Sequence, residues 1–295
     1  VLQKPFRKKD INQKNTETSL IEYFLYPKYG PGQLWTKVAE LVEEKGGILH
    51  KNAKVIQLNG TKELTSALVE TGKEKIQSTI IFDYCISTMP IKDLFNAFSF
   101  TIPSDIKYIS DNLVYRDFIT VGILLDKTKI ELNDNWIYIQ ESYVKVGRIQ
   151  VFNNWSPFLV KESDTTWLGL EYFCNENDAL WQLEVDELIA LATEELIQLG
   201  FIDSQKNVLD ATVIKVPKTY PAYFGAYNKF YKIREFVDSI DNLFLIGRNG
   251  MHKYNNQDHS MLTAMQAVQN IKKGILSKEN IWSINTEEEY HEEKK

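Results

Sequence analysis

The segment Leu-Phe-Leu-Ile-Gly-Arg-Asn-Gly-Met-His-Lys-Tyr-Asn-Asn-Gln-Asp-His-Ser-Met-Leu-Thr-Ala-Met, residues 243–265, joins an apolar run to a polar loop and a helical pattern. The run from Leu243 to Ile246 predicts a buried strand that stops at Gly247. Asp258 is the predicted N-cap of the helix that follows. The apolar positions that define the expected buried face of this helix are Met261, Ala264, Val268, Ile271 and Ile275.

This order of strand, turn and helix start has a chemical consequence. It places backbone N–H groups and the positive end of a helix dipole at one point, which suits an anion or the polar edge of a ring ligand. An ordinary strand–loop–helix connection, with Arg248 in a structural ion pair, explains the local pattern equally well.

The composition is that of a globular protein with one large domain or two medium ones. The chain has 295 residues, 43% hydrophobic and 25% charged, and a net charge of -6 with scattered basic residues, which argues against a nucleic-acid partner. No apolar run is long enough to cross a membrane and no signal-peptide pattern opens the chain. Cys85 and Cys174 lie in apolar segments, which favours two buried thiols in a reducing, cytoplasmic compartment, although a single disulfide is also compatible with the pattern.

The first part of the chain alternates helix and strand signals. Leu34, Val38, Leu41 and Val42 mark the inner face of a predicted helix that Gly46-Gly47 closes. The other predictions are a strand at 48–58, a hairpin turn at Asn59-Gly60, a meander to Ile76, a strand at 79–87 buried on both faces, a helix at 91–98 and a loop around Pro103.

The middle of the chain predicts a mainly antiparallel sheet. Its expected strands are 114–125, 136–140, 148–152, 167–173 and 209–216, with a helix at 185–199 and an aromatic loop at 218–231. We therefore expect an α/β (α+β) protein with an interleaved layout. One domain holds 27–109 and 242–281, and the sheet domain, 110–241, is inserted between them. Residues 1–26 are a lead-in segment, 282–295 form a charged tail expected to be disordered, and the start at Val1 suggests a fragment or a processed or engineered chain.

Several kinds of catalytic or binding site are excluded by spacing. None of the glycines forms the G-x-G-x-x-G pattern of a nucleotide site, and no P-loop is present. His252 and His259 lack the spacing of a metal site, so we expect no metal. Adjacent Asp258, His259 and Ser260 cannot form a nucleophile–base–orienter chain. The sequence identifies no catalytic residue.

Four stretches, in order along the chain, resemble the FAD-dependent amine oxidase superfamily, which includes protoporphyrinogen oxidase-like and UDP-galactopyranose mutase-like enzymes. They are Tyr-Pro-Lys-Tyr-Gly-Pro-Gly-Gln-Leu at 26–34, the strand at 52–56, Ser-Thr-Met-Pro at 87–90, and Gly247-Arg248 with the Lys-Tyr-x-Asn-Gln-Asp that follows at 253–258. The last is most similar to the mutases. The likeness spans almost the whole chain, from about residue 20 to residue 274.

The resemblance implies a flavin site and a substrate site. The implied FAD-binding residues are Val55, Gly247, Arg248, Gln257, Asp258, His259, Ser260 and Met261. The implied substrate residues are Tyr29, Arg116, Trp155, Tyr220, Tyr227 and Tyr254. A core or surface position is an alternative for each of Tyr29, Trp155, Tyr220 and Tyr227, and a salt bridge with Asp117 or another carboxylate is an alternative for Arg116.

The chain departs from the family in two ways. It has no counterpart of the N-terminal βαβ unit with its glycine-rich loop, so the expected FAD site is incomplete and 27–109 with 242–281 form a partial FAD-binding domain. Asn256 stands where mutases tend to carry an acidic residue.

The expected function is therefore the C-terminal portion of an FAD-dependent oxidoreductase acting on a small molecule. The flavin N5 would accept a hydride or, in a UDP-galactopyranose mutase-like enzyme of surface polysaccharide (LPS) biosynthesis, attack the anomeric carbon of a nucleotide sugar. A non-catalytic binding or scaffold module derived from the substrate domain is the alternative. The oligomeric state stays open.

Overall fold

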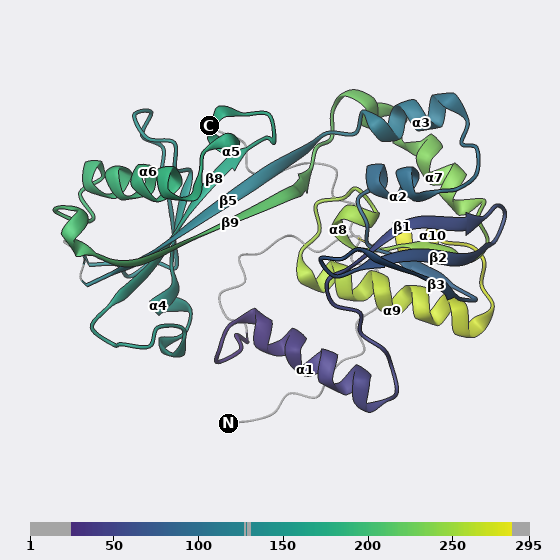
Figure 1. Cartoon of the computed structure of the whole chain (residues 1–295), viewed down its shortest axis with the longest axis horizontal. Coiled ribbons are helices and arrows are strands. Elements are labelled where there is room, and N and C mark those ends of the chain that lie inside the picture. Colours follow the sequence, from purple (N-terminus) through teal and green to yellow (C-terminus); the bar gives the residue numbers. More distant parts are fainter. Residues whose placement is uncertain (1–24, 127, 129–130, 285–295) are drawn as a thin grey trace. The chain divides into compact units, whose positions relative to one another are not determined.

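The computed structural model describes residues 25–126, 128 and 131–284, which form two compact units (Figure 1). Unit 1 holds 51–114 and the residues from 220 onward, and unit 2 holds 115–219 with the residues that precede 51. The mixture of helices and antiparallel sheets confirms the predicted fold class. The predicted lead-in and charged tail lie almost wholly outside the described residues.

Unit 1 combines an antiparallel meander with a short parallel sheet. The meander consists of β1 (Ala53–Gly60), β2 (Leu64–Thr71) and β3 (Ile76–Ile81). The parallel pair is β4 (Cys85–Ser87) and β10 (Leu243–Leu245). The helices of this unit are α2 (Ile91–Ala97), α3 (Ser104–Asp111), η3 (Gly225–Lys229), α7 (Phe230–Asp238), α8 (Gly247–Gly250), α9 (Gln257–Lys273) and α10 (Glu279–Trp282).

The pairing of β4 with β10 shows that the chain returns to unit 1 after the insertion. Asn242, immediately before β10, secures this return with its side chain. Its Oδ1 accepts from the Leu64 N–H at 2.8 Å, and its Nδ2 donates to the carbonyls of Leu64 and Asp83, each at 2.7 Å. One buried amide thus ties the last strand to the meander and to the chain leading into β4.

Unit 2 is built on a five-stranded sheet in the order β6-β7-β8-β5-β9. The strands are β5 (Tyr115–Leu125), β6 (Trp136–Tyr138), β7 (Arg148–Val151), β8 (Thr166–Cys174) and β9 (Val208–Pro221), whose last two residues belong to unit 1. The helices are α1 (Pro31–Glu44), α4 (Phe152–Trp155), η1 (Pro157–Leu159), α5 (Ala179–Gln182), α6 (Val185–Gln198) and η2 (Gln205–Asn207).

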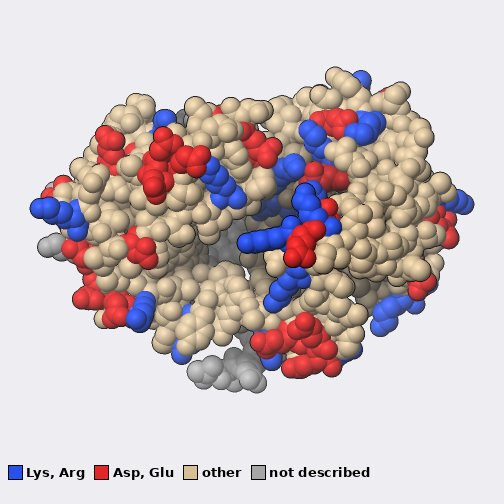
Figure 2. Space-filling model, in the orientation of Figure 1, with Lys and Arg blue, Asp and Glu red and all other residues tan. Residues whose placement is uncertain are grey.

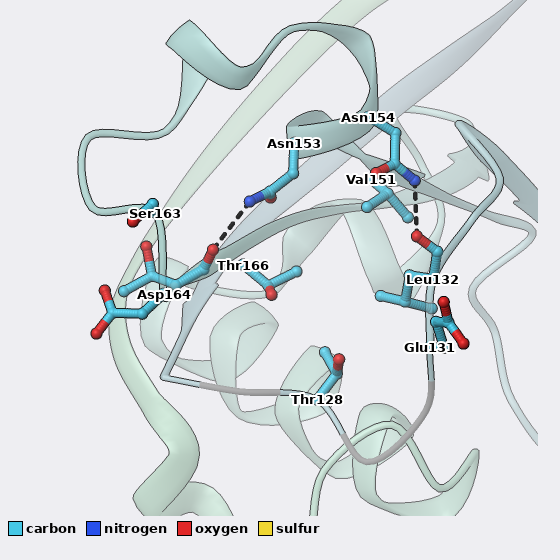
Figure 3. A pocket seen from close by; sticks show the side chains of 10 residues that line it. Thr128, Glu131, Leu132, Val151, Asn153, Asn154, Ser163, Asp164 and Thr166 are labelled. Atoms are coloured by element: carbon cyan, nitrogen blue, oxygen red, sulfur yellow. Dashed lines mark hydrogen bonds between the residues drawn. The ribbon is translucent and has the colours of Figure 1, made fainter.

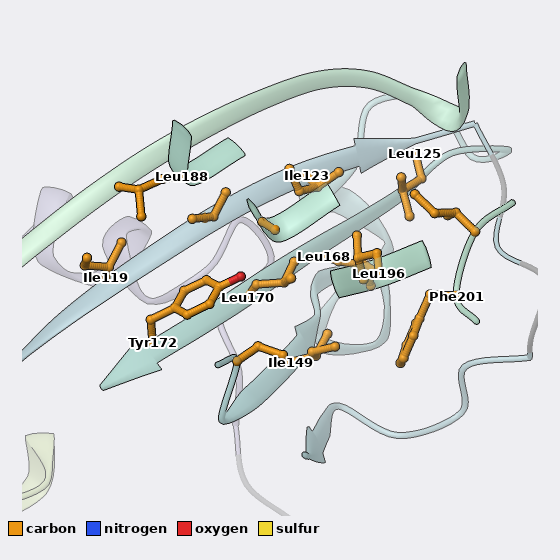
Figure 4. Close-up of a cluster of buried hydrophobic side chains, with 14 of the residues drawn as sticks. Ile119, Ile123, Leu125, Ile149, Leu168, Leu170, Tyr172, Leu188, Leu196 and Phe201 are labelled. Atoms are coloured by element: carbon orange, nitrogen blue, oxygen red, sulfur yellow. The ribbon is translucent and has the colours of Figure 1, made fainter. Parts of the chain in front are cut away.

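The core of unit 2 forms between this sheet and α6 (Figure 4). Alternate residues of β5 and β8 point to the helix because side chains alternate along a strand. Ile119, Ile123, Leu168 and Leu170 are fully buried there. Glu195 of α6 is a buried carboxylate, and it accepts hydrogen bonds from the Lys145 and Val146 N–H groups and the Tyr172 hydroxyl, at 2.6, 3.2 and 2.9 Å.

Several local predictions were wrong. β1 continues through Asn59-Gly60, and the hairpin turn lies at 61–63, where the Thr61 N–H donates to the Glu63 carbonyl at 3.1 Å. The run at 79–87 is not one buried strand but divides into the end of β3 and β4. The predicted aromatic loop at 218–231 instead holds the end of β9, η3 and the start of α7. A helix, α3, follows Pro103, where a loop was expected.

Two predicted helices form with their apolar faces exposed. Leu34, Val38, Leu41 and Val42 of α1 all remain open to solvent. In α9 the buried residues are Thr263, Ala267 and Asn270, not the predicted apolar positions. The compact units also group 24–50 with the sheet and 220–241 with unit 1, whereas the predicted functional domains divide these segments differently.

Candidate functional site

The turn after β10 is shaped by two glycines. Gly247 has a φ of 71°, a left-handed conformation that other residues rarely adopt. A Cβ at Gly250 would lie 2.6 Å from the carbonyl oxygen of Ser87, so only glycine lets α8 approach the end of β4 so closely. These contacts bring the ends of both parallel strands to one point.

The start of α9 joins the same point. The Gly247 N–H donates to Thr263 Oγ1 at 3.1 Å, and Ser260 and Thr88 both lie within 4 Å of the Cβ position of Gly247. The carboxyl ends of β4 and β10, the turn and the first helical turn of α9 therefore form one local structure. Asn249 Oδ1, in the turn, is buried without a hydrogen-bond partner among the described residues.

Arg248 is held in place by the loop between α8 and α9. Its Nε donates to the Asn255 carbonyl at 2.9 Å, and its guanidinium carbon lies 5.2 Å from the ring centre of Tyr220 and 4.8 Å from that of Tyr254. The two tyrosine rings are themselves stacked, with centroids 5.8 Å apart. The structure thus brings together three of the predicted residues as one cluster, which we call the Arg248 cluster (Arg248, Tyr220 and Tyr254).

A buried histidine supports the loop that carries Tyr254. His252 is fully buried and has a φ of 48°. The centre of its ring lies 5.7 Å from the ring centres of both Tyr227 and Phe230. Its Nε2 donates to the Ala222 carbonyl at 3.2 Å. Burial lowers the pKa of His252 to about 4, against the weaker opposing effect of that carbonyl, so the ring is neutral at physiological pH.

The predicted N-cap of α9 needs correction. The helix begins at Gln257, and Asn256 is the N-cap, with a reciprocal capping box to His259. Asp258 lies in the first turn. The cap engages the His259 N–H, and the Ser260 N–H donates to the Asn256 carbonyl at 3.1 Å. Among the amides of 258–260, that of Asp258 is the one without a partner in the described part of the chain.

Val55 lies on the wall of a hollow of about 330 Å³ between the meander and β4. The pairing of β1 with β2 shifts register between Val55 and Gln57, so the strand is irregular at this position. Cys85 also lines the hollow, and burial raises the pKa of its thiol to about 11, which keeps it protonated. The wall of the hollow is mainly apolar.

The other predicted substrate residues are divided between the two units. Tyr227 packs against Tyr223 and Phe230 in unit 1, with ring centroids 4.9 and 5.4 Å apart. Tyr29, Arg116 and Trp155 belong to unit 2. Tyr29 is an exposed ring in an edge contact with Phe158, and Trp155 stacks on Tyr26 at 5.3 Å. Asp117, the alternative partner of Arg116, accepts from the Lys218 N–H at 2.7 Å.

Three supporting residues were missed by sequence reasoning. His252 and Asn255 are polar residues in a polar loop, and neither gives a sequence signal of its burial. Tyr223 belongs to the aromatic segment at 218–231, and its hydroxyl accepts the Tyr254 N–H. That clustering of tyrosines before a predicted ligand loop is the one signal that could have identified Tyr223.

A second hollow, of about 350 Å³, lies between loops of unit 2 (Figure 3). The side chain of Asn153 donates to the Thr165 carbonyl and that of Asn154 to the Leu132 carbonyl, each at 2.9 Å. These amides are used to hold the loops together, and we assign no ligand to this hollow. On the face in Figure 2, acidic and basic side chains are interspersed on both units.

None of the helices within the described ranges combines the length and apolar character that a membrane span requires.

No protein-family model and no curated protein sequence matches the chain. Solved structures do match. A reduced UDP-galactopyranose mutase matches with a TM-score of 0.72 and 19% identity, over 87% of this chain and 54% of that chain. A protoporphyrinogen oxidase-like protein from Exiguobacterium sp. 255-15 matches with a TM-score of 0.57 and 13% identity, over 75% of this chain and 46% of that one. A redesigned putrescine oxidase matches with a TM-score of 0.51 and 14% identity, over 73% of this chain and 46% of that chain.

At these identities the likeness establishes the fold. The chain spans about half the length of each of these structures. The match confirms the predicted resemblance, and this chain has a fold similar to that of the FAD-dependent amine oxidase superfamily, to which the three solved structures belong.

Proposed function

We propose that this chain is the C-terminal portion of an FAD-dependent oxidoreductase and that the Arg248 cluster binds the diphosphate of a dinucleotide or nucleotide-sugar ligand. The observation that carries the proposal is the convergence of Arg248, Tyr220 and Tyr254 with the glycine turn and the first turn of α9. A permanent cation, two phenols and a helix start form a donor set that suits phosphate oxygens.

The residues of this chain supply only part of the contacts that the FAD diphosphate requires. Arg248 contributes the positive charge of its guanidinium group, whose Nε is bound to the Asn255 carbonyl. Asp258 adds a backbone N–H near the positive end of the α9 dipole. The sequence holds no G-x-G-x-x-G pattern for the remaining phosphate contacts. The residues present therefore suit one side of a pyrophosphate, and a second polypeptide segment would supply the other.

The substrate side of the proposal is less complete. When bound, FAD would supply the capacity to accept electrons from an organic substrate. Tyr220 and Tyr254 would orient a substrate by stacking and by hydrogen bonds from their hydroxyl groups. We extend the proposal to a nucleotide sugar because the mutase structure covers 87% of this chain and because Arg248 and Tyr254 lie together. Tyr29, Arg116 and Trp155 remain predicted substrate residues.

The experiment is to measure the binding of UDP and of FAD to the purified chain by isothermal titration calorimetry. We expect weak binding of both, and at least about a tenfold loss of affinity in Arg248→Ala, since a charged hydrogen bond to phosphate is worth roughly 1.5–3 kcal/mol. Arg234→Ala is the matched control, because Arg234 also lies against an aromatic ring, Trp282, at 5.4 Å but outside the Arg248 cluster.

Unchanged binding in Arg248→Ala would remove the proposed role of the cluster. Binding of UDP without FAD would favour the nucleotide-sugar branch, whereas FAD without UDP would favour a general oxidoreductase. Binding of neither ligand by this chain, when it is joined to the part of the mutase that it does not match, would favour the non-catalytic module.

A further inference from the structure

The loop between α8 and α9, residues 251–256, consists of turns and irregular backbone, and we call it the Tyr254 loop. It carries Tyr254 of the Arg248 cluster, and its Asn255 carbonyl accepts the Arg248 Nε–H at 2.9 Å. His252, in the middle of the loop, has a left-handed φ of 48°, which is an unfavourable conformation for a residue other than glycine. Such a residue keeps one conformation only where its surroundings fix it. The contacts of this loop therefore determine where the guanidinium of Arg248 and the ring of Tyr254 lie.

The first contacts of the Tyr254 loop are with the segments that form the site. The Lys253 N–H donates to the Arg248 carbonyl at 2.9 Å, and the Tyr254 N–H donates to the Tyr223 hydroxyl. These bonds close the backbone of the loop on Arg248 and on the tyrosine-rich segment before η3. They orient the loop within the site, and a support from outside the site is needed to fix both together.

That support comes from α10, at the end of the described chain. Lys253 Nζ donates to the Trp282 carbonyl at 2.9 Å, at the C-terminal end of α10, where helix carbonyls have no partner within the helix. The ring centre of Phe230 lies 5.7 Å from that of His252 and 6.2 Å from that of Trp282. Two consecutive residues of the loop, His252 and Lys253, are therefore supported by Trp282, the first through a ring and the second through a hydrogen bond.

Trp282 is itself fixed by α7. Its side chain is buried, its indole N–H donates to the Asp238 carboxylate at 3.0 and 3.1 Å, and the guanidinium carbon of Arg234 lies 5.4 Å from its ring centre. At the other end of α10, Lys278 is buried and its Nζ donates to the Ile240 carbonyl at 2.6 Å, just after α7. Because α10 is bonded to the end of α7 at both of its own ends, the Trp282 carbonyl is an acceptor in a fixed position.

We propose that Lys253 and Trp282 form an anchor that positions the Arg248 cluster before a ligand binds. Lys253 is a positioning residue, because its backbone N–H holds the Arg248 carbonyl while its side chain holds α10. Trp282 supplies the fixed carbonyl and, through Phe230, the ring support for His252. The inference rests on the proposed function, since the residues that the anchor positions are those that would meet the diphosphate.

The anchor has an effect on affinity that can be measured. A mobile loop loses conformational entropy when it closes on a ligand, whereas an anchored loop has already lost that entropy on folding. Removal of the anchor should therefore weaken the binding of UDP and of FAD about three- to tenfold, although the Arg248 cluster itself is unchanged.

The test compares the wild-type chain with Lys253→Met, which keeps an unbranched side chain and removes its donors. Hydrogen exchange of the Tyr254 amide and of the Arg248 Nε–H is measured by NMR without ligand. We expect both rates to rise by at least about fivefold relative to the Ser99 amide, which donates to the Leu58 carbonyl in unit 1 at 3.0 Å. Because global unfolding of unit 1 would speed all three rates together, these ratios report the loop alone. Lys253→Arg, which keeps a charged donor, should restore at least half of the protection.

Two further variants locate the effect. Lys232→Met is the matched control, because the ammonium group of Lys232 also donates at 2.8 Å, to Asp105, at an exposed contact between α7 and α3 outside the anchor. It should change neither ratio. Trp282→Phe removes the indole bond to Asp238 and keeps a ring beside Phe230, and it should raise the Tyr254 ratio by at least about twofold.

The outcomes separate the anchor from the proposed function. Unchanged exchange ratios in Lys253→Met overturn the anchor, as does an equal change in Lys232→Met. Faster exchange together with weaker binding of UDP or FAD supports both proposals. Faster exchange with unchanged affinity in Lys253→Met, while Arg248→Ala loses affinity, overturns the anchor and leaves the proposed function standing. Faster exchange in a chain that binds neither ligand supports the anchor of the Arg248 cluster and removes the proposed function.

Discussion

The two units contain sheets of opposite character. In unit 2, β8 pairs with β5 over nine residues and with β7 on its other side, and the residues that face α6 are fully buried. In unit 1, β4 is three residues long, pairs only with β10 among the described strands, and leaves Ile86 exposed. Hairpin-connected antiparallel strands find their partners nearby in the chain, whereas parallel strands depend on distant segments. The sheet of unit 2 is complete even though β5 pairs with β8 and β9, which lie far from it in the chain, whereas β4 of unit 1 has a single partner among the described strands.

The largest expected difference between the sheets is in their sensitivity to truncation. Leu170→Ala should lower the free energy of unfolding of unit 2 by about 3 kcal/mol, because Leu170 is fully buried between Val121 and Ile149. Ile86→Ala should cost unit 1 less than about 1 kcal/mol, because its side chain is already partly solvated. Denaturation can be followed by fluorine NMR of fluorotryptophan, since Trp282 reports unit 1 and the other tryptophans report unit 2. Similar losses of unfolding free energy from the two substitutions would contradict the proposed difference between the two sheets.

The second prediction concerns pH and applies to unit 1. His252 has a folded pKa of about 4 against an ordinary value of 6.5, so the unfolded chain takes up a proton first as the pH falls. The contribution of the neutral His252 ring to the free energy of unfolding is fully present above about pH 6.5. It is lost between pH 6.5 and pH 4, and the loss reaches about 2 kcal/mol at pH 5. The Trp282 fluorine signal should show this loss in the wild type and not in His252→Asn. His50→Gln, which changes an exposed histidine, is the control. If the free energy of unfolding of His252→Asn falls with pH as steeply as that of the wild type, the burial of this ring does not cause the loss of stability.

The smallest expected change in stability comes from a substitution on the exposed apolar face of α9, which we call the stripe (Met261, Met265 and Val268). Met265→Lys should change the free energy of unfolding of the free chain by less than about 0.5 kcal/mol, because the side chain is 62% exposed. The same substitution should reduce the binding of a hydrophobic dye, since it interrupts an apolar patch. A loss of more than about 2 kcal/mol in the free energy of unfolding would mean that Met265 packs against the chain itself. Unit 1 would then resemble unit 2, whose apolar residues are buried.

The sequence predicts unit 2 well because its patterns are local. The strands 114–125 and 167–173 and the helix 185–199 are confirmed within a few residues as β5, β8 and α6. Alternation along strands and the stop signal at Gly200 describe these elements without reference to the rest of the fold.

The errors in unit 1 have identifiable causes. Met261 and Val268 of α9 were assigned to the core because they are apolar, yet Thr263 and Asn270 are buried instead. Each has hydrogen-bond partners there: Thr263 Oγ1 accepts from Gly247, and Asn270 Nδ2 donates to the Ser277 carbonyl at 3.0 Å. Hydropathy cannot show that a polar side chain has found a partner. The helices α3 and α7 were also missed, and neither begins with a side-chain N-cap.

The candidate site was predicted in part. Arg248, Gly247 and Tyr254 could be found from one segment, and Tyr220 joined them through its place in an aromatic run. Their common support by His252, Asn255 and Tyr223 depends on loop geometry that no local pattern describes. The residues in unit 2, Tyr29, Arg116 and Trp155, stay predictions because they belong to a different compact unit.

The Asn242 bridge affects the order in which the molecule can assemble. Its partners Leu64 and Asp83 precede it by 178 and 159 positions, with the whole of the unit 2 sheet encoded in the interval. During synthesis on the ribosome, β4 must wait until its partner β10 emerges, while β5, β8 and α6 are already free to fold. Unit 1 therefore begins first and is completed last, and in that interval β4 has no partner strand.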